Sequence, residues 1–193
     1  SNDGKYICNC LESIISQNLI EIEILCIDIS WKDVFIQRLE LYRKRNPRIK
    51  IIHLSGYKLA AAKNIAVQCA VGEYLLFIDS DDFLEKNALD SLYQKTVAEH
   101  LDLLLFQTKL YNESFEEDLS DQYSKYKKKY SGQALLEKFQ KEGQYVLLNS
   151  RQLIYREYFI NHELWLKPGM DYEDKIYTFT NIIQASGVRY IPE

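Results

Sequence analysis

Three aspartates, Asp79, Asp81 and Asp82, follow directly after the apolar segment 74–78 and are the residues of this chain best placed to do chemistry. Carboxylates this close repel one another by roughly 1 kcal/mol or more per close pair. A bound cation would remove that repulsion, and hard divalent ions such as Mg²⁺ and Mn²⁺ prefer oxygen ligands. Such an ion could also bind a diphosphate and neutralise it as it leaves. An Asp-x-Asp triplet is short and common, so taken alone it favours a solvated turn with a helix-capping aspartate.

Alternating helix and strand patterns in the first half of the chain predict how these carboxylates are positioned. Apolar residues recur at helical spacing in four segments and form the continuous runs of buried strands in four others. The predicted helices cover 7–15, 35–42, 59–69 and 89–96, and the predicted strands cover 22–27, 49–54, 74–78 and 101–106. Such strands imply a parallel sheet covered on both sides, in which ligands gather at the carboxyl ends of the strands. Asp28 and Asp79 both stand at such ends.

Breaker and capping residues predict where the elements end. Asn46-Pro47 stops the second helix, and Gly72 suits the C-terminal cap of the third. For the second half we expect a polar loop over 111–130, a helix capped by Ser131, a helix over 176–183 closed by Gly187, and a strand over 188–191.

Composition and charge exclude several function classes. With 193 residues, 47% of them hydrophobic and 27% charged, the chain is long and apolar enough for one globular domain. A net charge of −4 gives no sign of nucleic-acid binding. The apolar runs are far shorter than a membrane span, and four cysteines in so apolar a domain indicate reduced thiols rather than a disulfide framework. We therefore expect a cytoplasmic protein.

The segment 123–130 is basic and aromatic. It could hold an anionic lipid surface or a polyprenyl-phosphate acceptor, which would place the protein peripherally at the inner face of the membrane. A solvated loop explains the same composition and is the simpler interpretation.

Several sequence motifs around the aspartates resemble those of the family-2 glycosyltransferases of the GT-A fold. In that family a helix with an A-R-N-x-G word precedes a G-E-Y word and a strand that ends in D-S-D-D. Residues 59–64 and 72–84 match these words in order and spacing. Weaker resemblances to the family occur at 6–17, which follows its first-helix pattern L-x-S-I-L-x-Q, and at 46–52, 169–174 and 188–193.

The resemblance implies an α/β GT-A (nucleotide-diphospho-sugar transferase) fold, Rossmann-like, with a mostly parallel sheet and helices on both faces. It also implies a metal-dependent, inverting transfer from a nucleoside-diphosphate sugar, with UDP-sugar as the expected donor. The acceptor would be a saccharide or a lipid-linked sugar in bacterial-type polysaccharide or glycolipid assembly. Within one domain over 1–193, residues 1–110 would bind the nucleotide sugar and 111–193 would shape the acceptor side.

The resemblance also assigns roles to individual residues. Carried over, the roles are Asp81 as ligand of Mn²⁺ or Mg²⁺, Asp28, Lys63 and Asp79 as nucleotide-sugar contacts, Asp174 as general base, and Trp165 and Tyr172 as acceptor contacts. The base must lie within hydrogen-bonding reach of the acceptor hydroxyl. Taken alone, Glu173 and Asp174 are explained by the helix dipole, which favours acids in a first turn, and the two aromatics by core packing.

The sequence departs from the family pattern in four places, one of which is Ala66, at the glycine position of the A-R-N-x-G word. Ile29 replaces the second acid of the family's D-D-G-S word, which hydrogen-bonds the nucleotide base, and this loss could weaken donor binding by roughly 1.5–3 kcal/mol. Trp31 either compensates by stacking or is an exposed loop residue. Lys63 replaces an arginine, which keeps the charge but loses bidentate phosphate recognition. The given sequence shows no apolar first strand before the first helix, so either it is a piece of a longer protein or the enzyme lacks that strand.

Three other functions compete with this interpretation. A degenerate, non-catalytic sugar-nucleotide-binding module would explain Ile29 and the missing strand. A nucleotidyltransferase also uses carboxylates at strand ends, but it should show a Gly-rich basic loop near the N-terminus, which this sequence lacks. A purely structural interaction domain would bind neither nucleotide nor metal.

Overall fold

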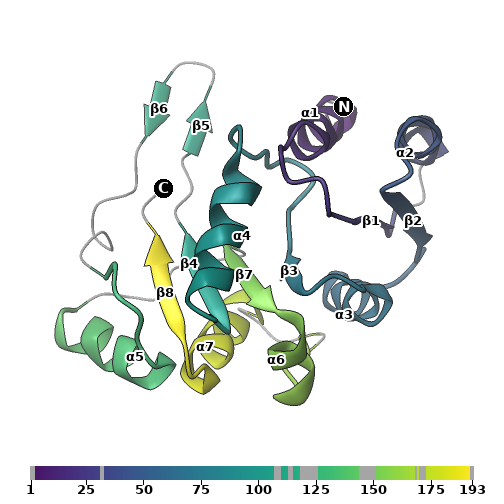
Figure 1. Ribbon diagram of the computed structural model, residues 1–193. Helices are drawn as coiled ribbons and strands as arrows, with labels where there is room; N and C mark the ends of the chain where they lie inside the picture. Colours follow the sequence, from purple (N-terminus) through teal and green to yellow (C-terminus); the bar gives the residue numbers. More distant parts are fainter. Residues whose placement is uncertain are drawn as a thin grey trace. The chain divides into compact units, whose positions relative to one another are not determined.

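The structure, a computed structural model, describes residues 3–30, 33–106, 110–112, 115–117, 126–143, 151–167, 169 and 173–191 (Figure 1). The chain forms two compact units, and it passes between them several times. Unit 1 consists of Ser1–Glu73, Ile78–Ser91 and Trp165–Asp171, and unit 2 consists of Tyr74–Phe77, Leu92–Leu164 and Tyr172–Glu193.

Unit 1 alternates helices with two parallel strands. Its elements are α1 (Asp3–Ile15), β1 (Ile24–Asp28), α2 (Asp33–Arg45), β2 (Ile49–His53) and α3 (Leu59–Cys69). The parallel pairing of β1 with β2 sets Asp28 opposite His53 at the carboxyl ends of both strands. The core of this unit is an apolar cluster whose buried members are Cys10, Leu11, Ile14, Ile24, Leu39 and Ile49. The helical spacing of Leu11 and Ile14 therefore marks the core-facing side of α1, as predicted.

The end of α3 differs from the prediction that Gly72 caps it. The cap residue is Ala70, which has an extended backbone (φ −71°, ψ 138°), and its N–H donates to the carbonyls of Ala66 and Val67. Gly72 instead donates its N–H to the Glu23 carboxylate at 2.9 Å, beside a 2.6 Å bond from the N–H of Val71. A partner distant in sequence thus determines how the chain leaves this helix.

Unit 2 is built on a four-stranded sheet. Its strands are β3 (Tyr74–Leu76), β7 (Gln152–Tyr155), β4 (Leu103–Phe106) and β8 (Val188–Ile191), in that spatial order. β8, yellow in Figure 1, is parallel to β4, whereas β7 is antiparallel to both of its neighbours. Its helices are α5 (Gly132–Lys141), α6 (Arg156–Asn161) and α7 (Glu173–Gln184), together with most of α4 (Ala88–Ala98), which begins in unit 1. Leu103, Leu104 and Leu105 are fully buried, as expected for a central strand covered on both faces.

The second half of the chain corrects several predictions. The expected loop over 111–130 contains an antiparallel hairpin of β5 (Leu110–Asn112) and β6 (Phe115–Glu117). β7 and α6 were not predicted, because the apolar run from Leu153 to Tyr155, three residues long and followed by charged residues, has neither a strand nor a helix period. The last helix ends at Gln184, before Gly187, whose carbonyl accepts from the amides of Asp102 and Leu103. Ser131 does cap α5, since its hydroxyl accepts from the Ala134 amide.

Within the described ranges, none of the helices combines the length and the apolar character that crossing a bilayer requires.

Candidate functional site

Asp79–Asp82, here called the acidic turn, is a tight turn of unit 1. The Asp82 amide donates to the Asp79 carbonyl at 3.0 Å, which closes the turn two residues after Phe77. All three of its carboxylates are on exposed residues, and 48% of the Asp79 side chain is accessible to solvent. Their charges therefore face water and any ligand that approaches from it.

Lys63 supplies a positive charge beside this turn. It lies on α3, and its Nζ is 3.8 Å from Asp79 Oδ1 while only 15% of the side chain is exposed. The structure thus brings together two of the residues predicted to contact the nucleotide sugar. An ammonium group beside a carboxylate can also bind a phosphate, which then competes with the carboxylate for the positive charge.

The pKa of the Cys10 thiol is raised mainly by burial and partly by the negative charges of the acidic turn. Burial raises its pKa to about 12, with further contributions from Cys26 and from all three carboxylates of the turn. The thiol is therefore protonated at neutral pH, and it donates to the Asp79 carbonyl with an S···O distance of 3.7 Å.

Asp28, at the end of β1, is bonded within the protein. Its Oδ1 accepts from the amide and the hydroxyl of Ser30, at 3.0 and 2.6 Å, and its Oδ2 is 3.2 Å from Nδ1 of His53. Burial alone would raise the pKa of Asp28, but the bonds from Ser30 and His53 outweigh it and lower the pKa below its ordinary value. The neighbouring Ile29 is partly exposed, and Trp31, predicted either to stack on the base or to be exposed, lies outside the described residues. The predicted role of Asp28 in donor binding stays a prediction.

Replacement of Asp28 by asparagine should lower the free energy of unfolding at pH 7 by about 1 kcal/mol, because a charged acceptor becomes neutral. The folded pKa lies below the unfolded one, so the carboxylate's contribution is fully present above the unfolded value of about 3.9 and is lost as the pH falls through the folded value. Urea unfolding of wild type and Asp28→Asn at pH 7 and pH 3 measures both differences. An equal difference at the two pH values would contradict this account.

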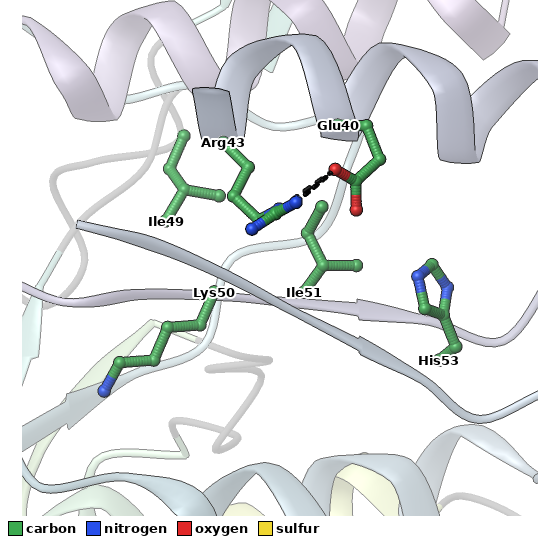
Figure 2. Close-up of a pocket in the computed structure, with 6 residues that line it drawn as sticks. All are labelled: Glu40, Arg43, Ile49, Lys50, Ile51 and His53. Carbon is green, nitrogen blue, oxygen red and sulfur yellow. Dashed lines mark hydrogen bonds and ion pairs between the residues drawn. The ribbon is translucent and has the colours of Figure 1, made fainter. Parts of the chain in front are cut away.

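A hollow of about 370 Å³ between α2 and β2 is lined in part by His53. Figure 2 shows Glu40 and Arg43 reaching from α2 over Ile49 and Ile51 of β2, with His53 farther along the strand and Lys50 pointing away from Glu40 and Arg43. Arg43 is paired with Glu40 at 2.7 Å, and Lys50 with Glu23 at 3.0 Å. None of the residues that line this hollow is predicted to contact the nucleotide sugar, so we do not place the donor here.

Asn64 holds the segment that carries Trp165. Its Nδ2 donates to the Leu166 carbonyl at 2.9 Å, and the Leu166 amide donates back to Oδ1 at 3.0 Å. Leu166 is buried and Trp165 is half-buried. The two bonds therefore attach Trp165, a predicted acceptor contact, to the helix that carries Lys63.

The predicted base, Asp174, is in the first turn of α7, where the helix dipole favours an acid. Its side chain and the whole of Tyr172 lie outside the described residues. The roles predicted for these two residues stay predictions.

Comparison with known proteins decides the family. The sequence model of glycosyl transferase family 2 matches residues 1–163. The chain belongs to this family. The putative glycosyltransferase EpsH of Bacillus subtilis is 28% identical to it, over 98% of this chain and 56% of EpsH. The chain spans about half the length, or less, of the curated relatives it matches.

Solved structures confirm the predicted fold class. Staphylococcus aureus TarS 1–349 in complex with UDP-GlcNAc has a TM-score of 0.80 and 22% identity, covering 100% of this chain and 54% of TarS. The mannosyltransferase of Pyrobaculum calidifontis, in complex with GDP-Man and Mn²⁺, has a TM-score of 0.68 and 12% identity, over 100% of this chain and 52% of that one. The two units described above are thus parts of a GT-A fold.

The donor atoms of the acidic turn fit a hard divalent cation. They are exposed carboxylate oxygens, and ions such as Mg²⁺ are usually held by one or two carboxylates together with substrate phosphates. No group of three or more His, Cys, Asp or Glu side chains that could hold a metal by itself occurs in the described part of the chain. A cation at the acidic turn would therefore need oxygen ligands besides these carboxylates.

Sequence reasoning missed several residues around the site. Asn64 stands in the family's A-R-N word, and Ser13 and Gln17 stand in its first-helix pattern, but no local feature showed which backbone groups they bind. The available signal was their polar character inside otherwise apolar helices, since a buried polar side chain needs a partner.

Proposed function

We propose that this chain is the transferase domain of an enzyme that moves a sugar from a nucleoside-diphosphate sugar, with UDP as the nucleotide, to a saccharide or lipid-linked acceptor. The observation that carries the proposal is the exposed acidic turn with Lys63 3.8 Å from Asp79. Lys63 and the acidic turn together offer one cationic and several anionic groups at one point, as binding a metal–diphosphate complex requires. Membership of family 2 and the nucleotide-sugar complexes of the two solved neighbours support it.

Each residue of the site has a distinct part in the proposed reaction. Asp81 would hold the cation, Asp79 would contact the ribose or the cation, and Mn²⁺ or Mg²⁺ there would neutralise the diphosphate as it leaves. Lys63 binds a phosphate oxygen as a point charge. Asp174 takes the proton from the acceptor hydroxyl, whose oxygen forms a bond to the anomeric carbon of the sugar as the bond from that carbon to the diphosphate oxygen breaks. A displacement from the opposite side inverts the configuration of that carbon.

The acceptor would lie against Trp165 and Tyr172. An aromatic ring offers an apolar face to a sugar and a polar edge to its hydroxyls. The bonds from Asn64 fix Trp165 on unit 1, which contains the acidic turn. This supports Trp165, which is on the same unit as the acidic turn, as an acceptor contact.

Titration calorimetry with UDP and Mn²⁺ tests the proposed donor site. We expect UDP binding that is at least about tenfold weaker when a chelator replaces Mn²⁺, because the cation screens the repulsion between diphosphate and carboxylates. GDP in place of UDP tests the choice of nucleotide. Absence of UDP binding with either Mn²⁺ or Mg²⁺ would refute the proposal.

The second candidate is the non-catalytic nucleotide-sugar-binding module. Ile29, partly exposed beside the bonded carboxylate of Asp28, favours it, because isoleucine cannot accept a hydrogen bond from a base. Hydrolysis of UDP-sugars in the presence of Mn²⁺ separates the candidates. A module would bind the donor and leave it intact, whereas a transferase without acceptor slowly passes the sugar to water.

A further inference from the structure

One face of α1 carries three polar side chains, Cys10, Ser13 and Gln17, spaced three and four residues apart. Residues with this spacing lie above one another on a helix. Gln17 follows the last turn, and its amide continues the helical path by donating to the Ile14 carbonyl at 3.2 Å. Cys10 and Gln17 are buried, and Ser13 is partly buried. Cys10 also belongs to the apolar core with Leu11 and Ile14, whereas Ser13 and Gln17 are not among the core residues.

Each member of the row bonds to the backbone of the segment that contains the acidic turn. The Cys10 thiol donates to the Asp79 carbonyl, with an S···O distance of 3.7 Å. The Ser13 hydroxyl accepts from the Leu84 amide at 3.0 Å while donating to the Cys10 carbonyl at 2.7 Å. The row therefore binds the chain both at the acidic turn and just after it.

Gln17 makes the longest connection of the row. Its Nε2 donates to the carbonyls of Ser13 and Glu85, both at 2.9 Å, and its Oε1 accepts from the Leu89 amide at 3.0 Å. Leu89 is in the first turn of α4, where amides have no partner within the helix. Gln17 thus caps the helix that follows the acidic turn, although it lies 72 residues away in the sequence.

The segment between β3 and α4 has no regular structure of its own. Residues 78–87 are neither helix nor strand, and Asn87 has a positive φ of 65°. A loop of this kind takes its path from the contacts that hold it. The side chains of Ser13, on α1, and of Gln17, just after it, bond to this loop and to the start of α4 from Leu84 to Leu89, shortly after Asp82.

We propose that Ser13 and Gln17 are positioning residues, which act through backbone bonds to present the carboxylates of the acidic turn in the arrangement that a cation and a diphosphate need. The inference rests on the function proposed above. Groups that orient metal ligands typically change metal affinity by 10- to 100-fold when they are replaced. We expect Ser13→Ala and Gln17→Ala to weaken Mn²⁺-dependent UDP binding by that factor.

The test combines affinity with a local measurement. Titration calorimetry gives the Mn²⁺-dependent affinity for UDP, and amide hydrogen exchange reports on Leu84 and Leu89, whose N–H groups bond to the two side chains. Ser13→Ala should raise the rate of hydrogen exchange at the Leu84 amide, and Gln17→Ala should raise it at the Leu89 amide. In each variant the faster exchange should accompany the loss of affinity for UDP. Ser16→Ala is the matched control, because its hydroxyl is exposed and bonds only to the Ser13 carbonyl among the contacts described, at 3.3 Å.

Conservative variants separate positioning from general stability. Ser13→Thr keeps the hydroxyl and should restore affinity. Gln17→Glu keeps an acceptor for Leu89 but cannot donate to Glu85 when ionised, so it should fall between wild type and Gln17→Ala. If Gln17→Ala does not fold, the inference is tested by the Mn²⁺-dependent affinity for UDP of Ser13→Ala compared with that of Ser13→Thr. Equal affinities of these two variants would contradict it.

The outcomes distinguish this inference from the proposed function. Wild type that binds UDP with Mn²⁺, together with Ser13→Ala and Gln17→Ala proteins that bind it equally well, would overturn the inference alone. Wild type that binds no UDP would overturn the proposed function, and the inference with it.

Discussion

Replacement of Asp81 by alanine should abolish Mn²⁺-dependent UDP binding, with an affinity loss of at least about 100-fold. Residues that merely orient a ligand cost 10- to 100-fold when replaced, and Asp81 is expected to be a ligand itself. The side chain is exposed in the acidic turn, so the free energy of unfolding should change by no more than about 0.5 kcal/mol. Calorimetry with UDP and Mn²⁺, paired with urea unfolding, measures the two effects separately.

The control for this variant is Glu21→Gln, which removes one negative charge from an exposed position before β1. If long-range charge alone mattered, both proteins would lose affinity to a similar extent. A protein with Asp81→Ala that still binds UDP more tightly with Mn²⁺ than with a chelator would show that another group holds the cation.

Replacement of Asp174 by asparagine should leave UDP-sugar binding intact and lower the rate of transfer by about 10²- to 10⁴-fold, the usual contribution of a general base. Asparagine has nearly the same shape but cannot accept the proton of the acceptor hydroxyl. The measurements are calorimetry for the donor and a single-turnover transfer assay with a saccharide acceptor. Turnover like that of wild type would discard Asp174 as the base.

Glu173→Gln provides the matched control, because Glu173 is the neighbouring acid in the first turn of α7. If the two acids serve only the helix dipole, each substitution lowers the free energy of unfolding by about 0.3–1 kcal/mol and neither changes the rate of transfer. If Asp174 is the base, the large rate effect belongs to Asp174→Asn alone.

The sequence predicted much of the secondary structure of unit 1, because its helices and strands bury regular apolar patterns. Leu11 and Ile14 marked the buried side of α1, and Pro47 marked the end of α2, which stops at Arg45. The expected strand over 49–54 is β2, and the expected helix over 59–69 is α3. The sequence motifs around the acidic turn also indicated the family, which the match over residues 1–163 confirms.

Unit 2 was less predictable, because its sheet depends on pairing between distant segments. β7 lies between β3 and β4 although it follows β4 by more than 40 residues. Only three of its residues are buried, and a run this short has no period that distinguishes a strand from a loop. Its place comes from the hydrogen bonds that the two neighbouring strands offer.

By itself, the sequence determined where the acidic side chains stand along the chain and which sides of the helices are apolar, because both are local patterns. The tertiary structure alone decided which distant backbone groups the polar side chains bind. Asn64 binds Leu166 across 102 residues, and Gln17 binds Leu89 across 72. Every buried amide and carbonyl needs a partner, but many partners satisfy that need equally well. Only the folded chain, by placing α1 and α3 against particular loops, selects one.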